Sequence, residues 1–177
     1  MREIYVVSDT HFGHANMLKF TDSTTGERIR PLWESVTDMD EYMIQQWNKT
    51  VQDQDIVYHL GDVYFSNGRD ILPRLRGRKR LILGNHDNGK DQNLHKHFEK
   101  ILMWRMFPEF GLLLTHVPVH PSNFEYKNLK CVHGHIHQST IMTVDQNGVS
   151  VPDDRYFNAC VEKINYTPIS MEELVPR

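Results

Sequence analysis

One pattern constrains this chain more than any other. A short apolar run ends in a polar cluster, and this arrangement recurs five times, in residues 3–9, 55–62, 79–87, 111–118 and 129–137. Short apolar runs rich in β-branched residues indicate buried strands, and the polar residues that follow them indicate loops. Because α/β proteins carry functional groups on loops at strand ends, we expect the polar clusters to form a site.

The segments between and after these strands predict the other layers. Helical spacing of apolar residues favours a helix over 35–51, capped by Thr37 or Asp38, and a weaker one over 68–76, which contains Pro73. Further strands are expected at 139–144 and 155–162. Alternating strands and helices, followed mostly by strands, predict a sandwich of sheets covered by helices. No linker divides the chain, so we expect a single domain over residues 1–177.

Composition narrows the class of protein. The chain has 177 residues, 39% of them apolar, and a formal net charge of −3, which suits a globular domain without a charge-driven preference for nucleic acid. No apolar run is long enough for a signal peptide or a membrane span. We therefore expect a cytoplasmic protein with no membrane partner, in which Cys131 and Cys160 are both reduced.

The polar clusters share one kind of chemistry. They contain Asp9 and His11, then Asp62, then Asn85, His86 and Asp87, then His116, and finally His135 and His137. Carboxylate, amide oxygen and imidazole together suit borderline divalent metals such as Mn, Fe, Co, Ni or Zn. These candidates are too many for one tetrahedral site. Seven ligands with one shared carboxylate suit two metal ions, which can clamp the attacking and leaving oxygens of a displacement at phosphorus.

The same clusters resemble a known family, the calcineurin-like metallophosphoesterases. The family pattern is D-x-H, then G-D, then G-N-H-[DE], then H, then G-H-x-H, and all five blocks occur here in order from Asp9 to His137. The chain is most similar to the small stand-alone members found in bacteria and phages. The resemblance implies an α/β fold of the four-layer αββα type, with two mixed β-sheets flanked by helices.

The resemblance also implies a role for each residue of the pattern. The metal ligands would be Asp9, His11 and His137 for one ion and Asn85, His116 and His135 for the other, with Asp62 as the bridge. His86 would be catalytic and help to protonate the leaving oxygen, and Asp87 would help to orient it.

The activity implied by the resemblance is hydrolysis of a phosphodiester or phosphomonoester of small or nucleotide-like size, by a hydroxide lying between two divalent metal ions. One alternative is a metal-dependent nuclease, for which the basic run 69–80 gives a weak reason. We regard nucleic acid as the less favoured partner, because this run is short and contains no aromatic residues. A second alternative is a non-catalytic metal-binding scaffold of the same fold. The sequence leaves the metal, the substrate and the oligomeric state open.

The long connection 12–54 adds candidates for substrate contact. His14 and Asn16 follow the first ligands on the same loop, where they would either contact a substrate or fix the loop. Arg28 and Arg30 lie farther along this connection, and an arginine can hold a phosphate through two hydrogen bonds.

Two other histidines have structural interpretations. His133 precedes the last pair of ligands with the same two-residue spacing, and we expect it to fix the orientation of a ligand from behind. His59 precedes the second cluster, where we expect a structural role.

Overall fold

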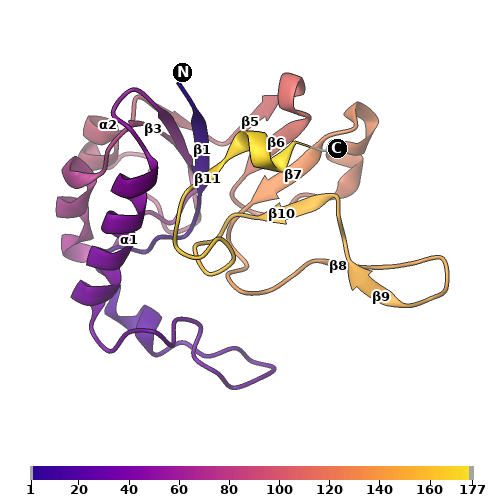
Figure 1. The fold of residues 1–177 in the computed structure, drawn as a ribbon, viewed down its shortest axis with the longest axis horizontal. Helices are drawn as coiled ribbons and strands as arrows, with labels where there is room; N and C mark the ends of the chain where they lie inside the picture. The colour runs from indigo at the N-terminus through magenta and orange to yellow at the C-terminus, as the bar shows by residue number, and fades with distance from the viewer. Residues whose placement is uncertain (1, 176–177) are drawn as a thin grey trace.

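Two mixed β-sheets packed face to face form the centre of the computed structural model, which describes residues 2–175 (Figure 1). The first sheet has the order β11-β1-β2-β3-β4, with bounds Ile169–Ser170, Ile4–Val7, Ile56–His59, Arg78–Ile82 and Lys100–Leu102. The second has the order β10-β7-β6-β5, with bounds Tyr156–Asn158, Lys130–His133, Leu112–Thr115 and Trp104–Phe107. In each sheet all neighbouring pairs are parallel except one, which joins β1 to β11 in the first sheet and β5 to β6 in the second.

The inner faces of the two sheets meet in a continuous apolar core. Val6 and Ile82 of the first sheet belong to the same buried cluster as Leu112, Leu114 and Val132 of the second. Burying such side chains stabilises the sandwich by roughly 1.5–3 kcal/mol each. This core fixes how the C-terminal strand ends of one sheet face those of the other.

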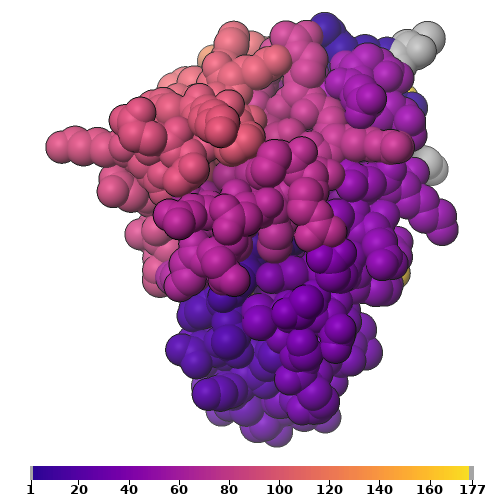
Figure 2. All heavy atoms as spheres, turned by 90° about the vertical axis from the view of Figure 1, so that its left-hand side faces the viewer, coloured from indigo at the N-terminus to yellow at the C-terminus, as the bar shows by residue number. Residues whose placement is uncertain are grey.

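The other face of the first sheet is covered by helix α1 (Val36–Thr50) and the short helix α2 (Gln92–His97). Met39, Met43 and Trp47 point from α1 into this second core. Ser35 caps α1 by accepting a hydrogen bond from the Asp38 N–H, so the expected cap at Thr37 or Asp38 was wrong by a few residues. Figure 2 shows this face, with the 12–54 connection (indigo to purple) in its lower part.

The segment that contains Pro73 forms a 3-10 helix, η2 (Ser66–Arg74), where an α-helix was expected over 68–76. Proline has no N–H to donate and its ring crowds the preceding turn, so an α-helix is disfavoured there. Other 3-10 helices are η1 (Ala15–Leu18), η3 (Pro108–Phe110), η4 (Pro121–Asn123), η5 (Glu125–Lys127) and η6 (Met171–Leu174).

The outer face of the second sheet has a thinner cover than the first. Phe124, which lies between the 3-10 helices η4 and η5, and Leu129, which follows η5, pack on Leu113 and Cys131. No α-helix lies over this face within residues 2–175, so the flanking layer on this side consists of short 3-10 helices. Part of the sheet beside it stays open to solvent.

A two-stranded hairpin, β8 (Met142–Val144) and β9 (Ser150–Pro152), extends beyond the sandwich (Figure 1). The two cysteines are both free and buried. Among the described residues, none of the helices has the length and apolar character needed to cross a membrane.

Candidate metal centre

The polar clusters meet because the strands that precede them are neighbours. β1, β2 and β3 are adjacent and parallel, and so are β6 and β7, so the loops at their C-terminal ends lie at one edge of each sheet. The segment after β10 joins the two edges. There the Ala159 N–H donates to the His133 carbonyl, while the Ser8 N–H donates to the Ala159 carbonyl.

Ligand-type side chains gather at this junction in two groups. The groups are Asp9, His11 and His137, and Asp62, His116 and His135, and within each the candidate ligand atoms lie within 4.8 Å of one another. The groups divide these six residues in the way that the family pattern implies, with Asp62 counted in the second. Their assignment as ligands remains a prediction.

The carboxylate of Asp62 lies between the two groups. Its Oδ2 is 3.7 Å from His11 Nε2 of the first group, and its Oδ1 is 3.7 Å from His116 Nε2 of the second. Oδ1 also accepts a hydrogen bond from the His86 N–H at 3.0 Å. Each oxygen of one carboxylate therefore faces a different group, which is the arrangement that a bridging ligand requires.

The first group contains buried polar atoms that have no protein partner. Asp9 Oδ2 accepts from Ser8 Oγ at 2.5 Å and from the His135 N–H at 2.9 Å, but Asp9 Oδ1 and both ring nitrogens of His11 are buried without a hydrogen bond. Leaving such groups unpaired costs about 1–3 kcal/mol each. A divalent cation would satisfy them, so the donors of this group fit a metal ion.

The charge states of Asp9 and His11 suit the same occupant. Burial alone would raise the pKa of Asp9, but the nearby imidazoles of His11, His137 and His116 outweigh it and hold the pKa well below the usual range. Burial also lowers the pKa of His11, which favours the neutral ring. A carboxylate beside a neutral imidazole is the protonation state in which both can bind a metal ion.

The second group is held by hydrogen bonds that leave lone pairs at its centre. His116 Nδ1 lies 2.7 Å from the Leu60 carbonyl, so Nδ1 carries the proton and donates it. Nε2 is then unprotonated, and its lone pair is available to a metal ion. Such an outer hydrogen bond fixes the tautomer and orientation of a metal-binding histidine. Asn85 Oδ1 lies 2.8 Å from this Nε2 and 2.9 Å from His135 Nδ1, so the three side chains converge.

The backbone of the site is strained. Positive φ angles occur at Asp9 (57°), His11 (49°), Asp62 (56°), His135 (73°) and His137 (48°). Non-glycine residues in this left-handed region cost about 1–3 kcal/mol each and persist only where the surrounding structure holds them. Five of the seven predicted ligands thus share a conformation that stores energy at this site.

Two glycines of the family pattern allow the loops of the site to approach one another closely. A Cβ atom on Gly134 would lie 2.0 Å from Ser8 Oγ and 2.2 Å from Asp9 Oδ2, and one on Gly84 would lie 2.2 Å from Asp62 Oδ1. Any side chain at these positions would push a predicted ligand out of place.

Glu162 is a residue of the site that sequence reasoning missed. Its Oε1 lies 3.1 Å from His137 Nδ1 and accepts a hydrogen bond from Arg30 Nε at 2.8 Å. Although burial disfavours its charge, Arg30 and His137 lower the pKa of Glu162, so the side chain is a carboxylate. A Glu in a weakly patterned segment far along the chain gives no signal in the sequence, because its partners come from remote loops.

Arg30 differs from its expected role as a substrate contact. Its side chain is completely buried, and besides Glu162 it donates to the carbonyls of Thr10 at 2.9 Å and Asp9 at 2.5 Å. These bonds direct the guanidinium toward the backbone of the first ligand loop, away from the solvent-facing side where a substrate would bind. Arg28 lies on the same connection, where it pairs with Glu34 at 2.7 Å.

The open side of the centre carries His86, which is exposed, and His14, which is half-buried. The ring of Phe65 stacks on that of His14 at 4.0 Å and on that of His11 at 5.5 Å, and lies 5.4 Å from that of His86. His14 therefore lies where a substrate contact is feasible, whereas Asn16 is exposed on η1 and its carbonyl accepts from Lys19. Phe65 was not identified from the sequence.

Asp87 holds the loops of the site together through backbone groups. Its carboxylate accepts from the N–H groups of Asp62 at 2.9 Å, Val63 at 3.0 Å and Gly84 at 2.9 Å. Burial raises the pKa of Asp87 against these hydrogen bonds. These contacts fix the loop that carries Asp62, and the expected role of Asp87 in orienting His86 stays a prediction.

His133 and His59 both lie behind the ligands. His133 is buried, with Nδ1 2.8 Å from the Gly134 carbonyl, and belongs to neither ligand group. His59 Nδ1 accepts from the Gly61 N–H at 3.2 Å, so its proton is on Nε2, 2.9 Å from Thr10 Oγ1. Burial lowers the pKa of His59 to about 3, which keeps it neutral. The buried position of His59 suits a structural role, whereas the expected role of His133 in orienting a ligand stays a prediction, because its contact is with the Gly134 carbonyl.

The basic run 69–80 is largely neutralised by ion pairs. Arg74 binds both carboxylate oxygens of Glu41, at 2.6 and 2.7 Å, and Arg78 pairs with Glu99 at 2.7 Å. A basic surface that binds nucleic acid needs free positive charge, so these pairs weaken the argument for a nuclease.

Known proteins resemble this chain in both sequence and fold. Residues 2–166 match the family model described as calcineurin-like phosphoesterase. An uncharacterized protein from Methanocaldococcus jannaschii is 33% identical over 99% of this chain and 90% of its own length. The gene 66 protein of Mycobacterium phage L5 is 27% identical, with 81% of each chain covered. A crystal structure of a protein of unknown function from Aquifex aeolicus superposes with a TM-score of 0.70, at 26% identity over 98% of both chains. The chain belongs to the calcineurin-like phosphoesterase family.

Proposed function

We propose that this protein hydrolyses a phosphodiester or phosphomonoester with two divalent metal ions. One would be held by Asp9, His11 and His137 and the other by Asn85, His116 and His135, with Asp62 between them. The observation that carries the proposal is the Asp62 carboxylate, whose two oxygens face the two groups at equal distances of 3.7 Å. Bound ions would supply an activated water at neutral pH and positive charge for the phosphoryl oxygens.

The chain itself would supply an acid and a fixed frame. His86 is exposed at the mouth of the site, and its ring lies 5.9 Å from that of His11. Its backbone N–H is held by Asp62 Oδ1, so its loop is tied to the bridging residue. In this place His86 would donate a proton to the leaving oxygen. Proton donation by a positioned histidine typically contributes about 10²–10⁴-fold to the rate.

The test combines a metal panel with one variant. Purified protein with Mn, Fe, Co, Ni, Zn or no metal is assayed on paired chromogenic monoester and diester substrates. His86→Ala should keep both ions, measured by elemental analysis, and lose about 10²–10⁴-fold in turnover. His95→Ala, an exposed histidine on α2, serves as the control.

Each result bears on one part of the proposal. Unchanged turnover in metal-replete His86→Ala would exclude this histidine as the acid. A wild-type protein that binds two ions but turns over neither substrate would instead support a non-catalytic metal-binding scaffold.

A further inference from the structure

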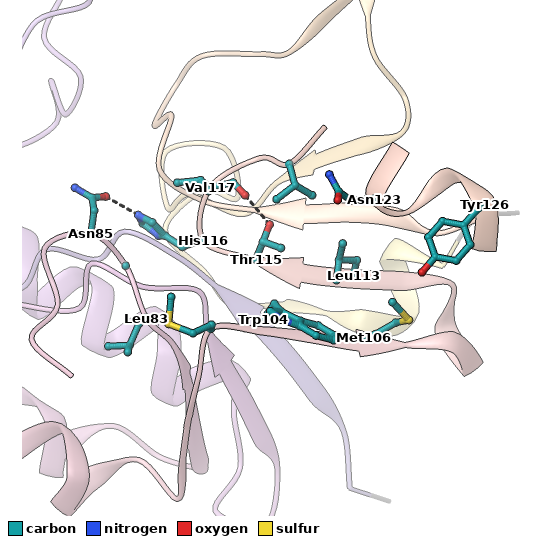
Figure 3. A pocket seen from close by; sticks show the side chains of 13 residues that line it. Leu83, Asn85, Trp104, Met106, Leu113, Thr115, His116, Val117, Asn123 and Tyr126 are labelled. Atoms are coloured by element: carbon teal, nitrogen blue, oxygen red, sulfur yellow. Dashed lines mark hydrogen bonds between the residues drawn. The ribbon is translucent and has the colours of Figure 1, made fainter. Parts of the chain in front are cut away.

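A cavity of about 580 Å³ opens on the thinly covered outer face of the second sheet. Asn85 and His116, which we propose as metal ligands, form one end of it, and Tyr126 of η5 lies at the other (Figure 3). Trp104 and Met106 of β5 lie along it beside Leu113 of β6 (Figure 3). Its size falls within the range of sites for small organic ligands.

The alternation of the strands explains why this cavity is apolar. Trp104 pairs with Thr115, and Met106 pairs with Leu113, so these side chains share the outer face of the sheet. Met103, Trp104 and Tyr126 are 68%, 58% and 69% exposed, and no Asp, Glu, Lys or Arg lines the cavity within the described residues. Large apolar side chains gathered in a concave surface mark a binding site.

We propose that this cavity binds the organic group of the phosphate ester, and that this group is flat, uncharged and aromatic, such as a phenyl ring or a nucleobase. The inference rests on the proposed function. The cavity is continuous with the proposed metal centre, because Asn85 and His116 belong to both. A phosphoryl group bound beside these two residues would therefore lie at the end of the cavity, with its ester substituent directed inward.

The chemistry of the walls favours an aromatic occupant. The ring of Trp104 offers a face for stacking, and Met103 and Met106 offer thioethers that pack well against ring edges. Charged ester groups would lose their hydration without gaining a partner of opposite charge. The occupant is more plainly part of the substrate than another protein, because the wall of the cavity includes Asn85 and His116, two of the proposed metal ligands.

The test measures binding by calorimetry to metal-loaded His86→Ala protein, because the proposed hydrolysis would consume the monoester probes during a titration of the wild type. The probes are inorganic phosphate, methyl phosphate, phenyl phosphate and adenosine 5′-monophosphate. Phenyl phosphate should bind about 10-fold or more tightly than methyl phosphate, since burying a ring contributes this much. Adenosine 5′-monophosphate should match phenyl phosphate if the occupant is a nucleobase, and bind no better than methyl phosphate if only a smaller ring fits. Either result supports an aromatic ester group.

Further substitutions in the same His86→Ala background show whether the preference for phenyl phosphate comes from the cavity. Trp104→Ala should reduce the preference for phenyl over methyl phosphate to about threefold or less, while Trp104→Phe keeps most of it. Met103→Ala should weaken it, whereas Met142→Ala, at an exposed methionine on β8, should not. Inorganic phosphate is the internal reference, because it reports the metal centre alone.

The inference is overturned if phenyl phosphate shows no preference, if it does not bind, or if Trp104→Ala keeps the full preference. It is also overturned if the metal-loaded protein is a dimer that Trp104→Ala dissociates, because a second copy would then occupy this face. If phenyl phosphate is preferred but the metal-loaded wild type turns over no ester, the proposed hydrolysis is refuted and the cavity assignment stands.

Discussion

Replacing Glu162 by glutamine tests whether this carboxylate supports His137 in the group formed by Asp9, His11 and His137. Oε1 of Glu162 accepts hydrogen bonds from His137 and Arg30. The side chain of Arg30 is fully buried, and that of Glu162 is 3% exposed. Glutamine keeps the shape of the side chain but removes the negative charge. The variant therefore leaves the buried cation of Arg30 without its counter-charge and removes the anionic acceptor from His137.

The expected magnitudes follow from these two losses. Removing one partner of a buried ion pair costs about 3–5 kcal/mol, which for a domain of this size lowers the Tm of the metal-free protein by about 6–20 °C. We expect the lower end for Glu162→Gln, because Arg30 keeps the carbonyls of Thr10 and Asp9 as acceptors. Loss of an outer partner of a metal-binding histidine lowers metal affinity by about 10–100-fold.

Two measurements separate these effects. Thermal unfolding of the metal-free protein reports the ion pair, and calorimetric titration with Mn or Zn reports the support of His137. Glu41→Gln is the matched control, because Glu41 pairs with Arg74 on the surface, where both side chains are more than 40% exposed. Such an exposed pair contributes about 0–1 kcal/mol.

Two results would refute the reasoning. If Glu162→Gln loses stability but binds both metal ions with wild-type affinity, Glu162 does not support His137 as a ligand. If the metal-free variant unfolds at the same temperature as the wild type, the buried pair does not stabilise the fold.

Two further predictions concern close packing and pH. Gly134→Ala should lower the free energy of unfolding by about 1–3 kcal/mol, because the new Cβ would clash with Ser8 Oγ. The variant should also bind less metal, as measured by elemental analysis. The control is Gly89→Ala, whose new Cβ would lie 3.3 Å from its nearest neighbour, and equal metal content in both variants would contradict the clash. Burial raises the pKa of Asp40 to about 6, whereas the pKa of an unfolded aspartate is near 3.9. Between these two values the folded state binds more protons than the unfolded state. The free energy of unfolding therefore falls as the pH rises from about 4 to 6. Asp40→Asn should therefore be more stable than the wild type by roughly 2–3 kcal/mol at pH 8 and equal to it near pH 4 in denaturant titrations, and a difference that does not change with pH would contradict the assignment.

Much of the fold was predictable because the signals are local. The central strands β1, β2, β6 and β7 lie inside the expected runs 3–9, 55–62, 111–118 and 129–137, and β3 begins one residue before the run 79–87. Helix α1 was predictable from its apolar spacing. The short helix α2 and the edge strands β4 and β5 were missed, because segments of three to six residues with mixed polarity gain their structure from the sheet or core that receives them.

The sequence by itself determined the chemistry of this protein, namely which oxygen and nitrogen donors follow which strands, and in what order. Tertiary structure decided how those donors are held. The left-handed backbone at Asp9 and Asp62 exists because neighbouring loops hold it there. Arg30 and Glu162 are 132 residues apart and form a pair only when the segment after β10 reaches the end of β1. The cavity beside Trp104 depends on a thin 3-10 layer over the second sheet. The formation of a strand depends largely on residues that are neighbours in the sequence, so a local pattern can predict it. The support of a ligand and the shape of a cavity depend on contacts between segments that are remote in the sequence, and no local pattern predicts these contacts.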